Sequence, residues 1–320
     1  MADWQLKIYY MNRTRNNLLT NDLQARRQFV QTIAKSALGA VVLGFFPGKI
    51  IASENHYEEM TVQQVIDLIQ HSVPGAPFPK TVDTIKAGDP NQKLTGIVTT
   101  MFATIEVIEK TAAINANLII AHEPTFYNGR DDTDYLQKDE LYLYKTALLK
   151  KHGITVWRFH DAHHAHRPDG VLQGVLNELG WDKLSEKGKP YIVHLPGTKL
   201  ENIIAHCKKN LQIDHLRFVG DKKQICSKIA LAPGSTGGRM HWNLLTTEKP
   251  DLLIVGEVDE WETSEYIRDL RASGSNISLL VLGHIVSEEP GSKWLAEWLQ
   301  PQVPAIKVVH IPAKDAFSWA

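Results

Sequence analysis

The sequence has few cysteines and no excess of charge of either sign. Among its 320 residues, Cys207 and Cys226 are the two cysteines, and neither belongs to a Cys-x-x-Cys pair. This excludes a disulfide framework and a thiolate motif for metal or redox chemistry. The 35 lysines and arginines nearly balance 36 aspartates and glutamates, so no strong overall field attracts nucleic acid or an anionic membrane. We therefore expect no nucleic-acid partner.

The sequence also offers no long hydrophobic run for a membrane span. The apolar stretch near the N-terminus, residues 36–46, is shorter than the about 20 residues that a spanning helix needs. Hydrophobic residues make up 43% of the chain and charged residues 22%, which is ordinary for a soluble globular protein. We expect no stable membrane span after processing.

A basic segment precedes this apolar stretch, which is the order found in export signals. Arg26-Arg27 followed by Phe29 resembles a bacterial twin-arginine signal, with departures from that pattern at Ala25 and Gln31. We interpret residues 1–53 as this signal and expect a periplasmic or exported protein. The alternative is a basic amphipathic helix that stays on a cytoplasmic protein.

From about residue 57 onward, apolar strand patterns alternate with helical patterns, which predicts an α/β fold. The pattern occurs twice and indicates two similar, pseudo-duplicated halves, residues 54–185 and 226–320, with a small inserted α/β element at 186–225. The expected strands are 96–102, 117–121 and 154–159 in the first half and 227–231, 251–257 and 277–283 in the second. The expected helices include 133–151, 170–179, 200–211 and 239–247. Chance similarity between two strand-and-helix units is the alternative to duplication.

Polar side chains follow the predicted strands in both halves. The strand 117–121 leads to His122-Glu123-Pro124, and the strand 251–257 also ends in a glutamate. The strand 154–159 leads to His160, just as 277–283 leads to His284. Ligands bind beyond the carboxyl ends of strands in open α/β sheets. We therefore expect a functional site between the halves.

The residues at these strand ends are typical metal ligands. Residues 160–166 hold four histidines and an aspartate, and Glu288 follows His284 by four residues. Imidazole with carboxylate suits zinc, iron, manganese or nickel. Taken singly, each segment has an ordinary alternative: a capped strand end, or an exposed flexible loop for the histidine tract.

Together the segments resemble the NIF-three-like family of dinuclear-metal proteins, often labelled GTP cyclohydrolase I type 2 homologues, over about residues 57–320. The family motifs are His-His-Pro, His-Thr-x-x-Asp and Gly-His-x-x-x-Glu. In the first motif, Glu123 replaces the second histidine. In the second motif, His164 replaces the aspartate. The third motif is intact as Gly283-His284 with Glu288. The segments 88–90 and 256–257 also resemble the family's Gly-Asp-Pro turn and Gly-Glu segment.

The resemblance implies two divalent metal ions, zinc, iron or manganese. The implied ligands are His122, Glu123, His164, His284 and Glu288. Glu288 would bridge the ions, with His122 and His284 on one ion and Glu123 and His164 on the other. Members of the family commonly form hexameric rings, so the resemblance also implies a homo-oligomer, with a hexamer as one form.

Such a site predicts a metal-dependent hydrolase that uses a metal-bridging water on an unknown small-molecule substrate. His160 or His163 is the expected general acid or base. The glycine-rich residues 234–238 lack the Gly-Lys-Ser/Thr of a phosphate-binding loop, so we interpret them as a turn first and a phosphate cradle second. The alternative function is a non-catalytic metal-binding or interaction scaffold.

Overall fold

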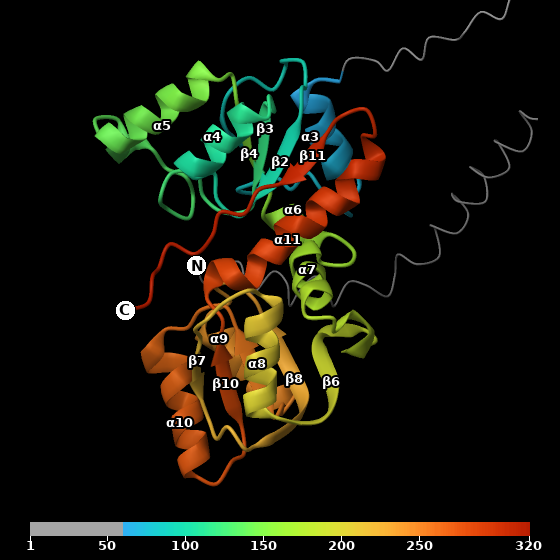
Figure 1. The fold of residues 1–320 in the computed structure, drawn as a ribbon, viewed down its shortest axis with the longest axis vertical. Coiled ribbons are helices and arrows are strands. Elements are labelled where there is room, and N and C mark those ends of the chain that lie inside the picture. Colours follow the sequence, from blue (N-terminus) through green and yellow to red (C-terminus); the bar gives the residue numbers. More distant parts are fainter. Residues whose placement is uncertain (1–59) are drawn as a thin grey trace, which may run out of the picture. The chain divides into compact units, whose positions relative to one another are not determined.

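The computed structural model describes residues 60–320, which form a mixed α/β protein with two sheets (Figure 1). The signal expected at residues 1–53 lies outside the described residues. Within residues 60–320, no helix combines the length and apolar character needed to cross a membrane.

Each sheet has three parallel strands at its centre. The first sheet has the order β1-β4-β3-β2-β11 and the second β5-β6-β8-β9-β10-β7. The strands of the first sheet are β1 (Ile85–Ala87), β2 (Ile97–Thr100), β3 (Leu118–Ala121), β4 (Thr155–Arg158) and β11 (Val308–His310). Those of the second are β5 (Ser185–Glu186), β6 (Lys189–Lys199), β7 (Arg217–Val219), β8 (Ile225–Ala232), β9 (Leu252–Val255) and β10 (Ser278–Val281).

Helices connect these strands. They are α3 (Val62–His71), α4 (Ile105–Ala113), α5 (Glu140–Lys151), α6 (Asp161–Ala165), α7 (Gly170–Glu178), α8 (Leu200–Asn210), α9 (Gly238–Thr247), α10 (Glu265–Ala272) and α11 (His284–Leu299). Short turns are 3-10 at η1 (Asp134–Leu136), η2 (Asp182–Leu184) and η4 (Gln300–Gln302), and π-helical at η3 (Glu260–Ser264).

One expected helix is shorter in the structure. The prediction of a continuous helix over 133–151 is wrong, because α5 begins at Glu140 and only the short turn η1 precedes it. The side chain of Asp139 accepts a hydrogen bond from the Tyr142 backbone at 2.8 Å. An aspartate in this capping position satisfies an orphan backbone N–H and so favours the start of the helix at this point.

The order of elements repeats along the chain. A helix and an edge strand, α3 and β1, precede the parallel unit β2-α4-β3-α5-β4, and α8 and β7 precede β8-α9-β9-α10-β10 in the same way. These two edge strands are antiparallel to their neighbours, β1 to β4 and β7 to β10. Segment 186–225, where we expected a small inserted element, thus supplies α8 together with β6 and β7, which pair within the second sheet.

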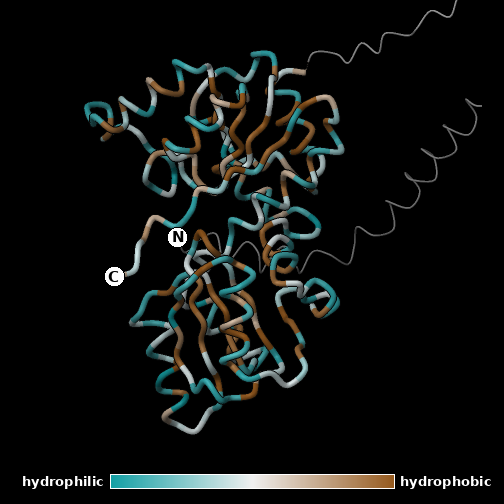
Figure 2. Tube along the Cα trace, in the orientation of Figure 1, coloured by the Kyte–Doolittle hydropathy of each residue, from teal (hydrophilic) through white to brown (hydrophobic). Residues whose placement is uncertain are grey.

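The central strands β2, β3, β4, β9 and β10 are buried along their whole length, whereas β8 is fully buried only over its last four residues. Every residue of β3 and β9 is buried, and apolar side chains pack on both faces of each sheet. Figure 2 shows these strands as brown, hydrophobic segments. Parallel strands covered on both faces are mostly apolar, and the ligand candidates of this region lie just beyond the strand ends.

Helix α11 links the two sheets. It begins directly after β10 of the second sheet and packs against β2 and β11 of the first. The Thr99 hydroxyl of β2 donates to the carbonyl of Ser292 on α11 at 2.7 Å. α11 also packs against α7 at Gly174 and Gly291. The middle of α11 is therefore held against the first half of the chain.

We predict that Gly174→Ala destabilises the protein by about 1–3 kcal/mol, the usual cost of overpacking. A Cβ at Gly174 would lie 2.3 Å from the Pro290 carbonyl oxygen and 2.4 Å from the Gly291 nitrogen. Because both atoms belong to the backbone, α7 and α11 would have to separate. Urea unfolding measures the effect. Gly129→Ala is the control, since its Cβ would meet nothing within 4 Å; equal stability of the two variants would contradict the close packing.

Candidate metal centre

The candidate ligands lie at the carboxyl ends of strands and at the start of α11. His122 and Glu123 follow β3, His160 follows β4, and His284 is the first residue of α11 after β10. Gly283, between β10 and α11, has φ of 104°, a conformation that glycine adopts without strain. The chain can therefore turn from strand to helix within two residues, which places Glu288 one helical turn beyond His284.

Two buried carboxylates form the middle of the cluster. One oxygen of Glu288 lies 2.9 Å from His284 Nε2 and 3.5 Å from His122 Nε2, and the other lies 4.0 Å from His164 Nε2. Glu123 Oε1 lies 3.3 Å from His284 Nε2. Glu123 and Glu288 are only 8% and 4% exposed. Residues from both halves of the chain therefore meet at these two carboxylates.

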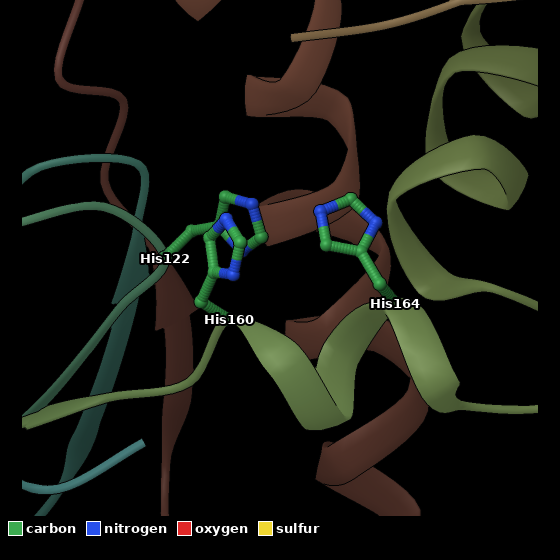
Figure 3. A group of neighbouring side chains, drawn as sticks. All are labelled: His122, His160 and His164. Atoms are coloured by element: carbon green, nitrogen blue, oxygen red, sulfur yellow. The ribbon is translucent and has the colours of Figure 1, made fainter. Parts of the chain in front are cut away.

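Three imidazoles form one side of this cluster (Figure 3). The ring of His122 stacks on that of His160 with centroids 4.7 Å apart, and the ring of His164 lies 5.1 Å from that of His122. Two groups of ligand atoms lie within 4.8 Å of one another: His122 with His160 and His164, and His122 with Glu123 and Glu288. Each group has the donors and the spacing to hold a metal ion.

Each histidine of the cluster, the three above and His284, has one ring nitrogen that faces away from Glu123 and Glu288. This nitrogen lies near a hydrogen-bond acceptor. Their Nδ1 atoms lie 3.2 Å from the Phe159 carbonyl for His122, 3.0 Å from Asp161 for His160, 3.3 Å from Asp169 for His164 and 3.3 Å from Glu257 for His284. Metal-binding histidines usually have such a partner, because it fixes the tautomer and the direction of the ring. The Nε2 atoms are thereby left available as ligands.

The electrostatics of the cluster favour a bound cation. Burial disfavours the charged form of His284, but hydrogen bonds with three carboxylates outweigh it and raise the pKa of His284 to about 12. Burial also opposes ionisation of Glu288, yet the neighbouring imidazoles of His122 and His284 hold its pKa well below the usual value. His122 Nε2 is buried without a hydrogen-bond partner in the described part of the chain. This donor set fits a divalent metal ion.

The structure brings together every ligand candidate of the sequence, namely His122, Glu123, His164, His284 and Glu288. It adds His160, whose Nε2 lies 3.7 Å from Glu123 Oε1. The glycine turn 234–238 also reaches the cluster, since a Cβ at Gly234 would lie 2.0 Å from a Glu288 oxygen.

His163, the other residue expected to act as general acid or base, lies next to His122. Its ring stacks on Phe159 at 5.1 Å and on Trp294 at 6.0 Å. Its Nδ1 is 3.4 Å from His122 Nδ1, and burial lowers the pKa of His163 well below the ordinary value. No ion pair joins it to a carboxylate among residues 60–320. The structure therefore places His163 in the aromatic core beside the site.

Sequence reasoning missed two residues of the site. Asp169 contacts His164 and also accepts hydrogen bonds from Val171 and Leu172 at the start of α7. Arg158 ends β4 and contacts Glu123 at 2.8 Å. Asp169 could have been found from the sequence, because it directly precedes the predicted helix 170–179 and aspartate commonly caps a helix at this position. Nothing local marks Arg158, because its partners lie on another segment.

The fold and the site define a duplicated α/β protein with a histidine–carboxylate centre. The chain matches the Duf34/NIF3 (NGG1p interacting factor 3) family over residues 60–316, and it belongs to this family. A protein of Clostridium perfringens named "GTP cyclohydrolase 1 type 2 homolog" is 28% identical over 282 residues, covering 81% of this chain and 100% of that protein. A Chlamydia pneumoniae protein of the same name is 27% identical over 244 residues, covering 73% and 90%.

Solved structures share the fold. A hypothetical protein of Staphylococcus aureus superposes with a TM-score of 0.67 at 20% identity, covering 82% of this chain and all of that one. A Bacillus cereus protein related to NIF3 has a TM-score of 0.64 at 15% identity, with the same coverage. At these identities the likeness concerns the fold alone. It confirms the two-half α/β architecture, and the family match confirms the expected family.

We predict that Asp169→Asn lowers the pKa of His164 in the metal-free protein. Burial opposes protonation of His164, but the charge and hydrogen bond of Asp169 are the largest opposing causes and raise its pKa to about 9. This is above the unfolded value of about 6.5, so the resulting stabilisation is complete below that pH and is lost as pH rises through about 9. In Asp169→Asn this stabilisation should be lost at a lower pH than in the wild-type protein.

Imidazole NMR titration and unfolding measured across this pH range test the prediction. Asp214→Asn, a change at an exposed aspartate, is the control. An unchanged His164 titration in Asp169→Asn would show that the other carboxylates alone set its pKa.

Proposed function

We propose that this protein is a metal-dependent hydrolase that holds two divalent ions, zinc, iron or manganese, in the histidine–carboxylate cluster. The observation that carries the proposal is the convergence of four imidazole Nε2 atoms on the two buried carboxylates of Glu123 and Glu288. Two bound ions would lower the pKa of a water molecule and stabilise the negative charge that develops on oxygen during hydrolysis.

Glu288 is the residue best placed to share two ions. Its Oε2 faces His122 and His284, whereas its Oε1 faces His164. A carboxylate with one oxygen toward each group of histidines has the arrangement of a bridging ligand. Glu123 Oε1 lies beside His284, so we assign Glu123 to the same ion as His284 and not to the ion of His164.

His160 is the candidate for proton transfer, and in this role its Nε2 is not counted among the ligands, because an imidazole nitrogen bound to a metal ion cannot accept a proton. Its side chain is 20% exposed, so a substrate can approach it. Burial is the main cause that lowers the pKa of His160, and a neutral imidazole can accept a proton. Asp161, 3.0 Å from His160 Nδ1, fixes the ring so that Nε2 faces the cluster.

Cysteine chemistry does not compete with this proposal. Burial raises the pKa of Cys207 to about 12 and, as the main cause, that of Cys226 to about 11. Both thiols therefore stay protonated at neutral pH, and the thiol is a poor nucleophile. The names of the relatives make GTP the first substrate to test, followed by other nucleotides, phosphoesters and esters.

We predict that purified protein holds close to two metal ions per chain, as a two-ion hydrolytic site requires, and that the double variant His122→Ala with Glu288→Ala loses them. Elemental analysis measures the content after reconstitution with zinc, iron or manganese. The matched control is His194→Ala with Glu186→Ala, an exposed histidine–glutamate pair with a 3.0 Å contact. This control should keep the metal, because it removes the same side chains from the surface.

Hydrolysis is then assayed before and after chelation. Activity that disappears with the chelator, returns with metal and is absent from the double variant supports the hydrolase. Metal bound at the same residues without turnover of any substrate class would contradict it and favour a metal-binding scaffold. Full metal content in the double variant would show that these residues are not the ligands.

A further inference from the structure

Arg158 is a buried arginine whose four hydrogen bonds all go to the candidate metal centre and the loop beside it. Its side chain is 4% exposed at the end of β4. It donates to Glu123 Oε2 at 2.8 Å, to the His122 carbonyl at 3.3 Å and to the Gly129 carbonyl at 2.8 Å. It also reaches Asp131 Oδ2 at 3.3 Å. Four acceptors hold the guanidinium in one orientation.

The far side of this network is the loop that follows Glu123. Asp131 accepts hydrogen bonds from the backbone of Thr125 at 2.6 Å and of Phe126 at 2.8 Å. It also lies 3.3 Å from Lys86 Nζ, and both side chains of this pair are buried. The loop therefore folds around Asp131, and Arg158 spans the space between this loop and Glu123.

The contact with Arg158 divides the two oxygens of Glu123. Oε2 is committed to Arg158 at 2.8 Å, whereas Oε1 faces His284 Nε2 at 3.3 Å and His160 Nε2 at 3.7 Å. A carboxylate without such a partner can bind a metal ion through both oxygens. Here only one oxygen is available to the cluster, and its direction follows from the position of the guanidinium.

We propose that Arg158 is a positioning residue that restricts Glu123 to a single-oxygen ligand and ties its direction to the loop 124–132. The proposal rests on the metal centre proposed above but not on hydrolysis. The planar guanidinium suits this role because it presents several donors in a fixed geometry, whereas a lysine ammonium is a point charge on a flexible stem.

The test is cobalt binding by metal-free Arg158→Lys, which keeps the charge and changes the geometry. Cobalt(II) is titrated into wild type and variant, its affinity is measured by chelator competition, and its visible absorption is recorded at saturation. We expect about 10- to 100-fold weaker binding, the usual effect of changing a residue that orients a ligand. We also expect a weaker absorption, because Glu123 becomes free to bind through both oxygens and to raise the coordination number.

Arg271→Lys is the matched control. Arg271 also donates to several acceptors, among them Gln224 Oε1 at 2.8 Å and the Ile277 carbonyl at 2.7 Å, but none belongs to the cluster. Its cobalt affinity and spectrum should equal those of wild type. Asp131→Asn is the second variant, to be used also where Arg158→Lys fails to fold. It weakens the anchor of Arg158 and should shift the spectrum in the same direction.

The spectrum separates positioning from a merely structural role. A purely structural arginine would lower the unfolding temperature but leave the cobalt spectrum unchanged at saturation, and superimposable spectra with affinity within twofold would overturn the proposal. Wild-type protein that binds no cobalt would overturn both this proposal and the metal centre. Cobalt binding with the expected variant effects, but without hydrolysis of any substrate, would overturn the hydrolase and support the role of Arg158.

Discussion

The site depends on the contact between the buried carboxylates of Glu123 and Glu288 and the imidazole of His284. The carboxylates come from different halves of the chain, and like charges so deeply buried would repel each other without a cation. His284 lies 3.3 Å from Glu123 and 2.9 Å from Glu288 and supplies that positive charge in the metal-free protein. The packing of α11 on the first sheet is therefore also an electrostatic requirement.

Much of the fold was predictable because the central strands β3 and β9 are apolar over their whole length. The runs in β3 and β9 and the polar residues after them are visible in the sequence. The edge strands were harder to predict, because the pairing of an edge strand depends on residues far away in the chain. Segment 186–225 shows this: β6 pairs with β8 and β7 with β10, and no local pattern in the segment specifies either partner.

The histidine tract shows where prediction of the site stopped. Spacing identified four histidines in residues 160–166 but not their directions. Helix α6 starts at Asp161, so His160 and His164 lie one turn apart and face the same way, whereas His163 and His166 contact the tryptophans of α11. The boundary of one short helix therefore decides which members of the tract are candidate ligands.

A metal ion at this candidate centre would have to compete with a proton. The carboxylates that would attract a divalent ion are the same groups that raise the pKa of His284 to about 12, and an imidazole binds metal only after it loses that proton. A divalent cation that displaces this proton raises the net charge of the cluster by one. The carboxylates beside it are already partly neutralised. Arg158 also affects the attraction of the centre for metal. Its positive charge next to Glu123 reduces the attraction for a second cation, whereas its geometry leaves one oxygen of Glu123 available. The affinity of the centre for metal would thus depend on a fixed arrangement of ligands more than on an excess of negative charge.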